Sequence, residues 1–416
     1  MAFSSNNNGS LFAEGVDCST IAEQHGTPCY VYSRSAIEAA FDEYQQALAG
    51  CEHLICYAVK ANSSLAVLDT LARRGAGFDI VSLGELERVL AAGGDPAKVV
   101  FSGVVKQRRE LRRALQVGIR CFNLESTAEL DVLQSVAAEL SLRAPISVRV
   151  NPDVDAKTHP YISTGLKENK FGVDREAALS LLRRAKSLDN IDVVGLDCHI
   201  GSQLTDMAPL LEAAQELLIL IDQLDAEGIA ISHLDLGGGI GVRYKNEVPP
   251  AIGAYIEALR DAIGARKLTL VLEPGRSIVA NAGVLLTRVH YLKETGSHNF
   301  ALVDAAMNDF IRPALYQAWV AISTVKAADC AAKRWDIVGP VCETADCLGK
   351  DRELALEEGT LLAVHGAGAY GFVMSSNYNS RPRAAELMVD GETCHLIRER
   401  ETLEDLMRGE HRLPSV

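Results

Sequence analysis

The segment LICYAVKAN, residues 54–62, contains the pattern that decides the fold, which is an apolar run of strand length ending in a lysine and an asparagine. Similar runs follow as far as residue 276, and amphipathic stretches rich in alanine and leucine separate them. Strands that alternate with helices form a parallel sheet, and eight such units in this length suit a closed (β/α)8 TIM barrel within the α/β class. A doubly wound open sheet is the alternative. The predicted strands are Leu54–Val59, Gly77–Val81, Val99–Ser102, Cys121–Leu124, Ile146–Val150, Val193–His199, His233–Leu236 and Leu268–Leu272.

Polar residues stand at one end of most of these runs. The C-terminal ends of barrel strands form a single face, and barrel enzymes build their active sites there. A chance distribution of polar residues at strand ends is the alternative, but it does not explain why the same end is polar in strand after strand. The polar ends are Lys60–Asn62, Asp79 with Ser82, Arg149–Pro152, His199–Ser202, Gly237–Gly239 and Glu273–Arg276.

The alternation of strands and helices stops near Gly283. Later runs read as strands with few long helices between them, and residues 11–32 also end in a strand-like run. A chain of 416 residues exceeds the roughly 250–300 residues at which one core stops growing. We therefore predict a barrel of residues 33–282 and a β-rich domain of residues 1–32 and 283–416. Its expected strands are Val284–Leu292, Phe300–Val303, Trp335–Val338, Leu361–Val364 and Ala385–Val389.

The composition of the chain argues against some classes of binding partner and some cellular compartments. The formal net charge of −14 argues against nucleic acids and anionic membranes, both of which select basic surfaces. No apolar run approaches the roughly 18 residues that cross a bilayer, and the first residues do not read as a secretory signal. The ten cysteines form no CxxC pair and no zinc-like spacing. We expect a cytoplasmic protein with reduced thiols and no metal.

Several barrel residues have two readings. Lys60 is either positioned for a covalent bond to an aldehyde cofactor or is a solvated lysine at a strand end. The glycines after the seventh strand either let backbone N–H groups approach a phosphate or form a tight turn. Arg276 follows the eighth strand, where barrel phosphate sites are common, and Ser202 could add a hydroxyl. If the aldehyde cofactor contains a pyridine ring, Glu273 would keep the ring nitrogen protonated. His199 either stacks on this ring or is a core residue.

Three segments of the second domain also carry chemically capable side chains. In Gly339–Asp346, the Cys342 thiol could protonate a carbanion and Glu343 could bind an ammonium group, although a surface turn is an equal alternative. Asp309–Tyr316 offers Arg312 and Tyr316 to a carboxylate. Ala367–Gly371 is a turn that carries the aromatic Tyr370.

These motifs together resemble the fold-type III pyridoxal-phosphate-dependent decarboxylases over nearly the whole chain. YAVKAN resembles the cofactor-lysine motif of that family. The segment 151–173 is similar to the branch of the family that acts on meso-2,6-diaminopimelate. The other matching motifs, in order, are HIGSQLTD (199–206), DLGGGIG (235–241), EPGRSIVANAG (273–283), NDFIRPALY (308–316), GPVCETADCL (339–348) and GAGAYGFVMSSNYN (366–379).

The resemblance implies a role for each residue. Lys60 would hold pyridoxal 5′-phosphate covalently, and Cys342 would protonate the α-carbon after decarboxylation. Cys342 and Glu343 would come from the second subunit of a homodimer, which makes each active site composite. The implied cofactor contacts are Lys60, Asp79, His199, Ser202, Gly238, Gly239, Glu273, Gly275, Arg276 and Tyr370, and the implied substrate contacts are Arg276, Arg312, Tyr316, Glu343 and Tyr370.

Substrate chemistry gives a separate argument for diaminopimelate. Its distal end is zwitterionic, so its site needs both a cation and an anion, and arginine suits a carboxylate. Ornithine has no distal carboxylate, so a desolvated Arg312 would face its ammonium group at a cost. Related basic-amino-acid or carboxynorspermidine decarboxylases, an amino-acid racemase and a cofactor-carrying binding protein are the alternatives. Glu273 and Cys342 argue against the racemase, and the second domain argues against the binding protein.

Overall fold

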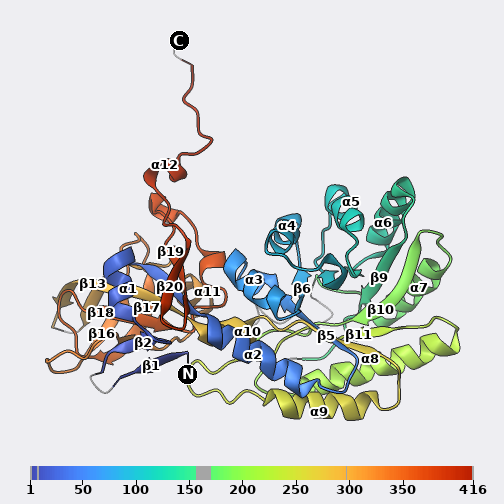
Figure 1. The fold of residues 1–416 in the computed structure, drawn as a ribbon, viewed down its shortest axis with the longest axis horizontal. Helices are drawn as coiled ribbons and strands as arrows, with labels where there is room; N and C mark the ends of the chain where they lie inside the picture. The colour runs from blue at the N-terminus through green and yellow to red at the C-terminus, as the bar shows by residue number, and fades with distance from the viewer. Residues whose placement is uncertain (1, 7–8, 156–169, 297, 415–416) are drawn as a thin grey trace. The chain divides into compact units, whose positions relative to one another are not determined.

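The computed structural model describes residues 2–6, 9–155, 170–296 and 298–414. The chain divides into two compact units, Glu38–Ile278 and a second unit formed by Met1–Ile37 with Val279–Val416 (Figure 1). Residues 156–169, which belong to the diaminopimelate-like segment 151–173, lie outside the described residues.

The first unit contains a closed barrel of parallel strands, which confirms the predicted TIM barrel and excludes the open sheet. Each strand pairs with the next along the chain, and β12 pairs with β5 to close the ring. The strands are β5 (His53–Ala58), β6 (Gly77–Ile80), β7 (Val99–Phe101), β8 (Cys121–Leu124), β9 (Ala144–Arg149), β10 (Ile191–Asp197), β11 (His233–Asp235) and β12 (Thr269–Leu272). All eight overlap the predicted runs and differ from them by at most two residues at either end.

Helices alternate with these strands, and Figure 1 shows them along the outside of the barrel. Side-chain caps fix where several of them begin: Ser82 accepts a hydrogen bond from the backbone N–H of Glu85, and Ser126 does the same for Glu129. Because each cap follows a strand closely, it also fixes the loop that carries the polar residues. The helices are α2 (Arg34–Ala47), α3 (Leu65–Arg73), α4 (Leu83–Ala91), α5 (Arg108–Val117), α6 (Thr127–Leu140), α7 (Arg175–Lys186), α8 (Ala208–Ala226), α9 (Ile252–Ile263) and α10 (Arg276–Val279).

The barrel interior changes character along its axis. Cys56, Val100, Cys121 and Val271 come from four strands and pack into one apolar cluster. Charged residues stand at or next to the C-terminal ends of several strands, and these include buried carboxylates. The apolar cluster therefore excludes water beneath a charged layer.

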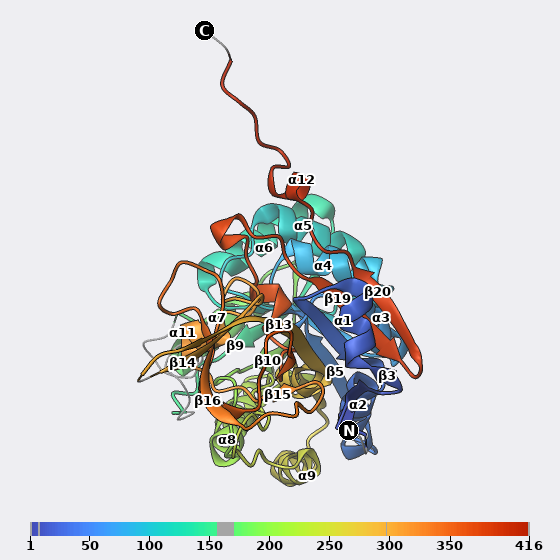
Figure 2. The same ribbon diagram turned by 90° about the vertical axis from the view of Figure 1, so that its left-hand side faces the viewer.

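The second unit is built around a mixed sheet that joins distant parts of the chain. The N-terminal strand β4 (Cys29–Ser33) lies between β13 (Gly283–Glu294), with which it is antiparallel, and β19 (Ala385–Asp390), with which it is parallel. Side chains of α1 (Cys18–His25) join the core beneath these strands. Figure 2 shows the ribbon of this helix next to β19. The remaining strands are β14 (Asn299–Val303), β15 (Ile322–Thr324), β16 (Lys333–Val338), β17 (Cys347–Leu354), β18 (Leu361–His365) and β20 (Thr393–Arg398), with a small sheet of β1 (Phe3–Ser5), β2 (Leu11–Ala13) and β3 (Val16–Asp17).

The five strands predicted after residue 283 are all present, and the structure adds β15, β17 and β20 to them. Among the described residues, no helix is both long and apolar enough to span a bilayer.

Candidate active site at the barrel face

Lys60 follows β5 in a short 3-10 turn, Val59–Ala61, and its ammonium group is held by a carboxylate from the neighbouring strand. The Lys60 Nζ lies 2.9 Å from Oδ2 of Asp79, which is fully buried on β6. The strand register causes this contact because Ala58 pairs with Asp79. The lysine side chain keeps 36% of its surface exposed, so its amine is both oriented and accessible.

The glycine loop after β11 has no space for side chains. A Cβ on Gly238 would lie 2.3 Å from the carbonyl oxygen of Glu273, and a Cβ on Gly237 would lie 2.6 Å from Nδ1 of His199. Gly237 also has φ +63°, which favours glycine. The loop therefore presents bare backbone, as a phosphate-binding loop requires.

Arg276 begins α10 and is nearly buried. Its guanidinium donates to Oγ of Ser202 from Nε (3.2 Å) and Nη2 (3.0 Å), and Nη1 donates to the hydroxyl of Tyr244 at 2.9 Å. The backbone at Gly275 is close, because a Cβ there would lie 3.0 Å from the Cβ atoms of Ala58 and Ala61. The sequence predicted Arg276 and Ser202, but it gave no role to Tyr244.

His199 follows β10 and is held as a neutral ring. The backbone N–H of Gly238 donates to its Nδ1 at 3.4 Å, so this nitrogen acts as an acceptor. Burial, together with the positive charges of Lys60 and Arg149, lowers the pKa of His199 well below its usual value. A neutral imidazole is suited to stacking on a planar cofactor.

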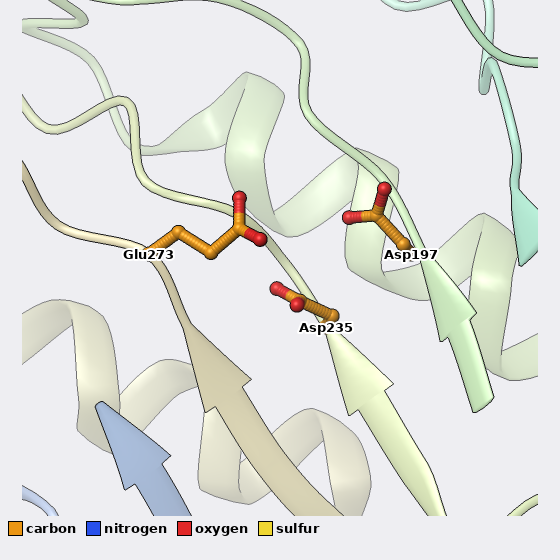
Figure 3. Close-up of side chains that lie close together, drawn as sticks. All are labelled: Asp197, Asp235 and Glu273. Carbon is orange, nitrogen blue, oxygen red and sulfur yellow. The ribbon is translucent and has the colours of Figure 1, made fainter. Parts of the chain in front are cut away.

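Three carboxylates converge at the ends of neighbouring barrel strands (Figure 3). Asp197 is the last residue of β10, Asp235 is the last residue of β11, and Glu273 follows β12. One oxygen from each lies within 4.8 Å of one from each of the others, and all three residues are buried. We name these residues the acidic cluster. The sequence predicted Glu273 only, although a charged residue at the last position of an apolar strand was a usable signal for Asp197 and Asp235.

Burial and mutual repulsion make the acidic cluster hold protons. Burial raises the pKa of Asp235 to about 7. Burial, followed by the charges of Asp235, Asp79 and Asp197, raises the pKa of Glu273 well above its usual value. Burial and the charge of Asp235 do the same for Asp197. In a site of low polarity, carboxylates this close cannot all be ionised unless a cation joins them.

The acidic cluster fits a bound pyridinium ring. Oε1 of Glu273 and Oδ2 of Asp235 are buried without a hydrogen-bond donor in the described part of the chain. A ring N–H would supply a donor and a positive charge together. A divalent cation could also be coordinated at this spacing. The surrounding residues, however, match a phosphorylated aldehyde with a ring nitrogen: the glycine loop and Arg276 suit its phosphate, and the amine of Lys60 suits its aldehyde.

The predicted residues of the second unit form their own arrangement. Cys342 and Glu343 are exposed, and Glu343 accepts a hydrogen bond of 2.6 Å from the hydroxyl of Tyr378. The buried Asp346 anchors their turn by accepting from the backbone N–H groups of Met307 (2.6 Å) and Val341 (2.7 Å). This turn is an organised surface segment.

Two further segments of this unit carry the other predicted residues. The helix α11 (Arg312–Tyr316) begins with Arg312, which is buried, and ends with Tyr316. Tyr370 has φ +54° in a turn that follows β18. The structure thus brings the predicted barrel residues together on one face and holds the remaining five on three segments of the second unit.

Comparison with known proteins identifies a family and several relatives of this chain. Residues 34–280 match the family model described as the pyridoxal-binding domain of pyridoxal-dependent decarboxylases. The chain is 66% identical over 404 residues to the diaminopimelate decarboxylase of Pseudomonas aeruginosa, which covers 97% of each protein. It is 59% identical to the diaminopimelate decarboxylase of Vibrio cholerae, with 99% of each covered.

Solved structures that are similar to this chain include proteins of the same kind. The diaminopimelate decarboxylase of Helicobacter pylori in complex with L-lysine superimposes with a TM-score of 0.91 at 45% identity, covering 94% of this chain and 98% of that one. The corresponding enzyme of M. jannaschii, also with L-lysine, gives a TM-score of 0.95 at 38% identity over 99% and 98% of the two chains.

Proposed function

The chain belongs to the pyridoxal-dependent decarboxylases, and we propose that it converts meso-2,6-diaminopimelate to L-lysine and carbon dioxide, the last step of lysine biosynthesis. One observation carries the proposal: the amine of Lys60, the glycine loop, Arg276 and Glu273 lie on one barrel face, in a chain 66% identical to a diaminopimelate decarboxylase.

Pyridoxal 5′-phosphate, when bound, supplies an electron sink for the carbon that loses its carboxylate. The residues of this chain would hold the cofactor in place and keep its ring nitrogen protonated. Lys60 would hold the cofactor covalently, with Asp79 orienting its amine at 2.9 Å. His199 would stack on the ring as a neutral imidazole, and Glu273 would accept the ring N–H.

The phosphate would be held by backbone and by few side chains. At Gly238, Gly239 and Gly275 a Cβ would approach other atoms of the chain to 3.0 Å or less, so only glycine fits there and the phosphate would meet backbone N–H groups. Arg276 and Ser202, which already bond to each other, would add charge and a hydroxyl. Tyr370 would complete the phosphate contacts and border the substrate.

The second unit would recognise the distal end of the substrate and supply a proton. Arg312 and Tyr316, with Arg276, would bind the distal carboxylate, and Glu343 would bind the distal ammonium group. The Cys342 thiol would deliver a proton to the α-carbon once carbon dioxide has left. These assignments rest on the motifs that carry these residues and on the names of the relatives.

We further propose that the active form is a cytoplasmic homodimer in which Cys342 and Glu343 serve the site of the partner subunit. Both residues are exposed in the isolated chain, as a contribution to another subunit requires.

The substrate assignment is tested by supplying meso-diaminopimelate, ornithine, lysine and alanine in separate reactions and measuring carbon dioxide release and racemisation. We expect release from meso-diaminopimelate alone, with L-lysine as product. The matched variant is Arg312→Leu, which should raise KM for diaminopimelate because the distal carboxylate loses a charged partner. Release from ornithine and not from diaminopimelate would overturn the substrate, and racemisation of alanine would overturn the reaction class.

A further inference from the structure

The acidic cluster contains more carboxyl groups than the nearby cations could balance if all of these groups were ionised. The register of the barrel places Arg149, Asp197 and Asp235 in one row, because Asp197 pairs with both of the others. Glu273 lies two residues beyond Val271, the partner of Asp235, and therefore points to the same side of the sheet. Four strands thus deliver one cation and three carboxylates to one level of the barrel.

The nearby cations already have partners. Arg149 lies 3.9 Å from Asp197 and 3.4 Å from Glu125, and Lys60 is paired with Asp79. Within the described residues, no basic side chain forms an ion pair with Asp235 or Glu273. One oxygen of Asp235 lies within 4.8 Å of one oxygen of Glu273, and both residues are buried. Two buried carboxyl groups this close hold a proton between them rather than ionise together.

The other titratable groups around the cluster do not supply a charge. Burial raises the pKa of the thiols of Cys56, Cys121 and Cys198, which keeps them neutral. Burial lowers the pKa of His233 to about 3, and that of His199 also falls well below its usual value, so both rings are neutral. The remaining charged neighbours are those already paired: Lys60 with Asp79, and Arg149 with Asp197 and Glu125.

We propose that Asp235 is a positioning residue for Glu273: the two carboxyl groups share one proton in the cofactor-free chain and release it to solvent when a ring cation lies beside Glu273. Oδ1 of Asp235 accepts the N–H of Gly237 at 2.9 Å, which fixes the carboxyl group, and leaves Oδ2 for the shared proton. Asp235 therefore makes Glu273 a stronger base, so that Glu273 keeps a ring nitrogen protonated. The inference rests on the proposed function through its cofactor only.

The first test counts protons without substrate. The cofactor-free chain is titrated calorimetrically with pyridoxine 5′-phosphate, which carries the ring and phosphate but no aldehyde to react with Lys60. Titrations at pH 6 in buffers of different ionisation heat give the number of protons released. We expect wild type to release about one proton more than Asp235→Asn, because Glu273 of the variant has no charged Asp235 beside it and is ionised before the ring binds. Equal counts would overturn the proposal.

Stability of the cofactor-free chain is the second readout. The pKa of Asp235 is about 7 in the folded chain and near 3.8 when unfolded, so the folded chain binds this proton more tightly. The resulting loss of stability is absent below about pH 4 and grows as the pH rises to about 7. The melting temperature of wild type should therefore fall more steeply between pH 4 and 7 than that of Asp235→Asn.

Matched variants keep the test decisive. Ser147→Ala removes a fully buried hydroxyl from β9 in the same barrel and should retain the wild-type proton count and pH slope. If Asp235→Asn does not fold, Glu273→Gln removes the other member of the pair and should show the same losses.

Infrared spectra of cofactor-free wild type should contain the band of a buried protonated carboxylic acid, and this band should disappear when the ring binds. Absence of the band would contradict the proposal. Failure to decarboxylate diaminopimelate would leave all three measurements interpretable, since none uses substrate.

Discussion

Lys60 is the residue on which the proposed chemistry depends most directly. Its amine is oriented by Asp79 and is accessible, so Lys60→Ala should abolish covalent retention of the cofactor and lower kcat by about 10²–10⁴-fold. Borohydride reduction followed by peptide mapping measures the covalent bond. Lys267→Ala, which changes an exposed lysine just before β12, is the matched control and should keep both the label and the activity. A label on any lysine other than Lys60 would contradict the assignment.

Gly238 tests the phosphate loop. A Cβ there would lie 2.3 Å from a backbone oxygen, so Gly238→Ala must displace the chain. We expect a loss of about 1–3 kcal/mol in unfolding free energy and weaker binding of the cofactor. Urea denaturation and cofactor titration measure the two effects. Gly253→Ala in α9 is the control, because a Cβ there has nothing within 4 Å and alanine favours the helix. Normal cofactor affinity in Gly238→Ala would show that the loop does not contact the phosphate.

The sequence was informative about residues that end a strand with unusual chemistry. Lys60 and Asp79 were both predicted for the cofactor site, and the structure pairs them. Asp197 and Asp235 were not predicted, because each is a single acidic residue at the end of an apolar run and local sequence assigns it no partner. Their importance depends on register across three strands, which no local pattern specifies.

At the level of elements, the turn between β16 and β17 depends on one buried carboxylate. Asp346→Ala would remove the acceptor for the N–H groups of Met307 and Val341, at a cost of about 1–3 kcal/mol for each buried donor. Activity should fall as well, because Cys342 and Glu343 lie on this turn. Urea denaturation and kcat are the measurements.

Glu353→Ala on β17 is the control for this prediction, since it removes an exposed carboxylate from the same segment. It should leave stability and activity close to wild type. If Asp346→Ala behaved the same way, the two hydrogen bonds would not be what organises the turn.

Elements were predictable where hydrophobic pattern and length agreed. All eight barrel strands are β-branched or apolar runs flanked by helices, so their pattern was clear. β17 and β20 were not predicted because their sequences, CLGKDREL and TCHLIR, contain charged and polar residues that face solvent and interrupt the apolar run. β15 has only three residues, too few to show a period.

For the whole molecule, composite active sites predict complementation between inactive variants. Lys60→Ala and Cys342→Ser should each be nearly inactive as homodimers. When the two are mixed and allowed to exchange subunits, half of the dimers are hybrids with one intact site, so activity should recover to about a quarter of wild type. Activity is measured alongside sedimentation, which verifies that both variants remain dimers. No recovery from exchanged subunits would place Cys342 in the same site as the Lys60 of its own chain.

The class of the fold could be predicted at this scale, but the organisation of the second unit could not. Eight strand–helix units in about 220 residues indicated a barrel, while an open sheet of the same units was excluded only by the pairing of β12 with β5. The place of β4 between β13 and β19 is a pairing of strands hundreds of residues apart, and nothing in the local sequence encodes it.

That arrangement of β4 imposes an order on biosynthesis. At about 5–20 residues per second, a ribosome needs roughly 20–70 s to travel from Ser33 to Ala385, which begins β19. During that interval the nascent chain carries an N-terminal strand that is fully buried in the folded protein and whose permanent neighbour on one side has yet to be translated. An unpaired strand edge of this kind recruits other chains. Premature termination before residue 385 should therefore yield aggregates that contain a finished barrel.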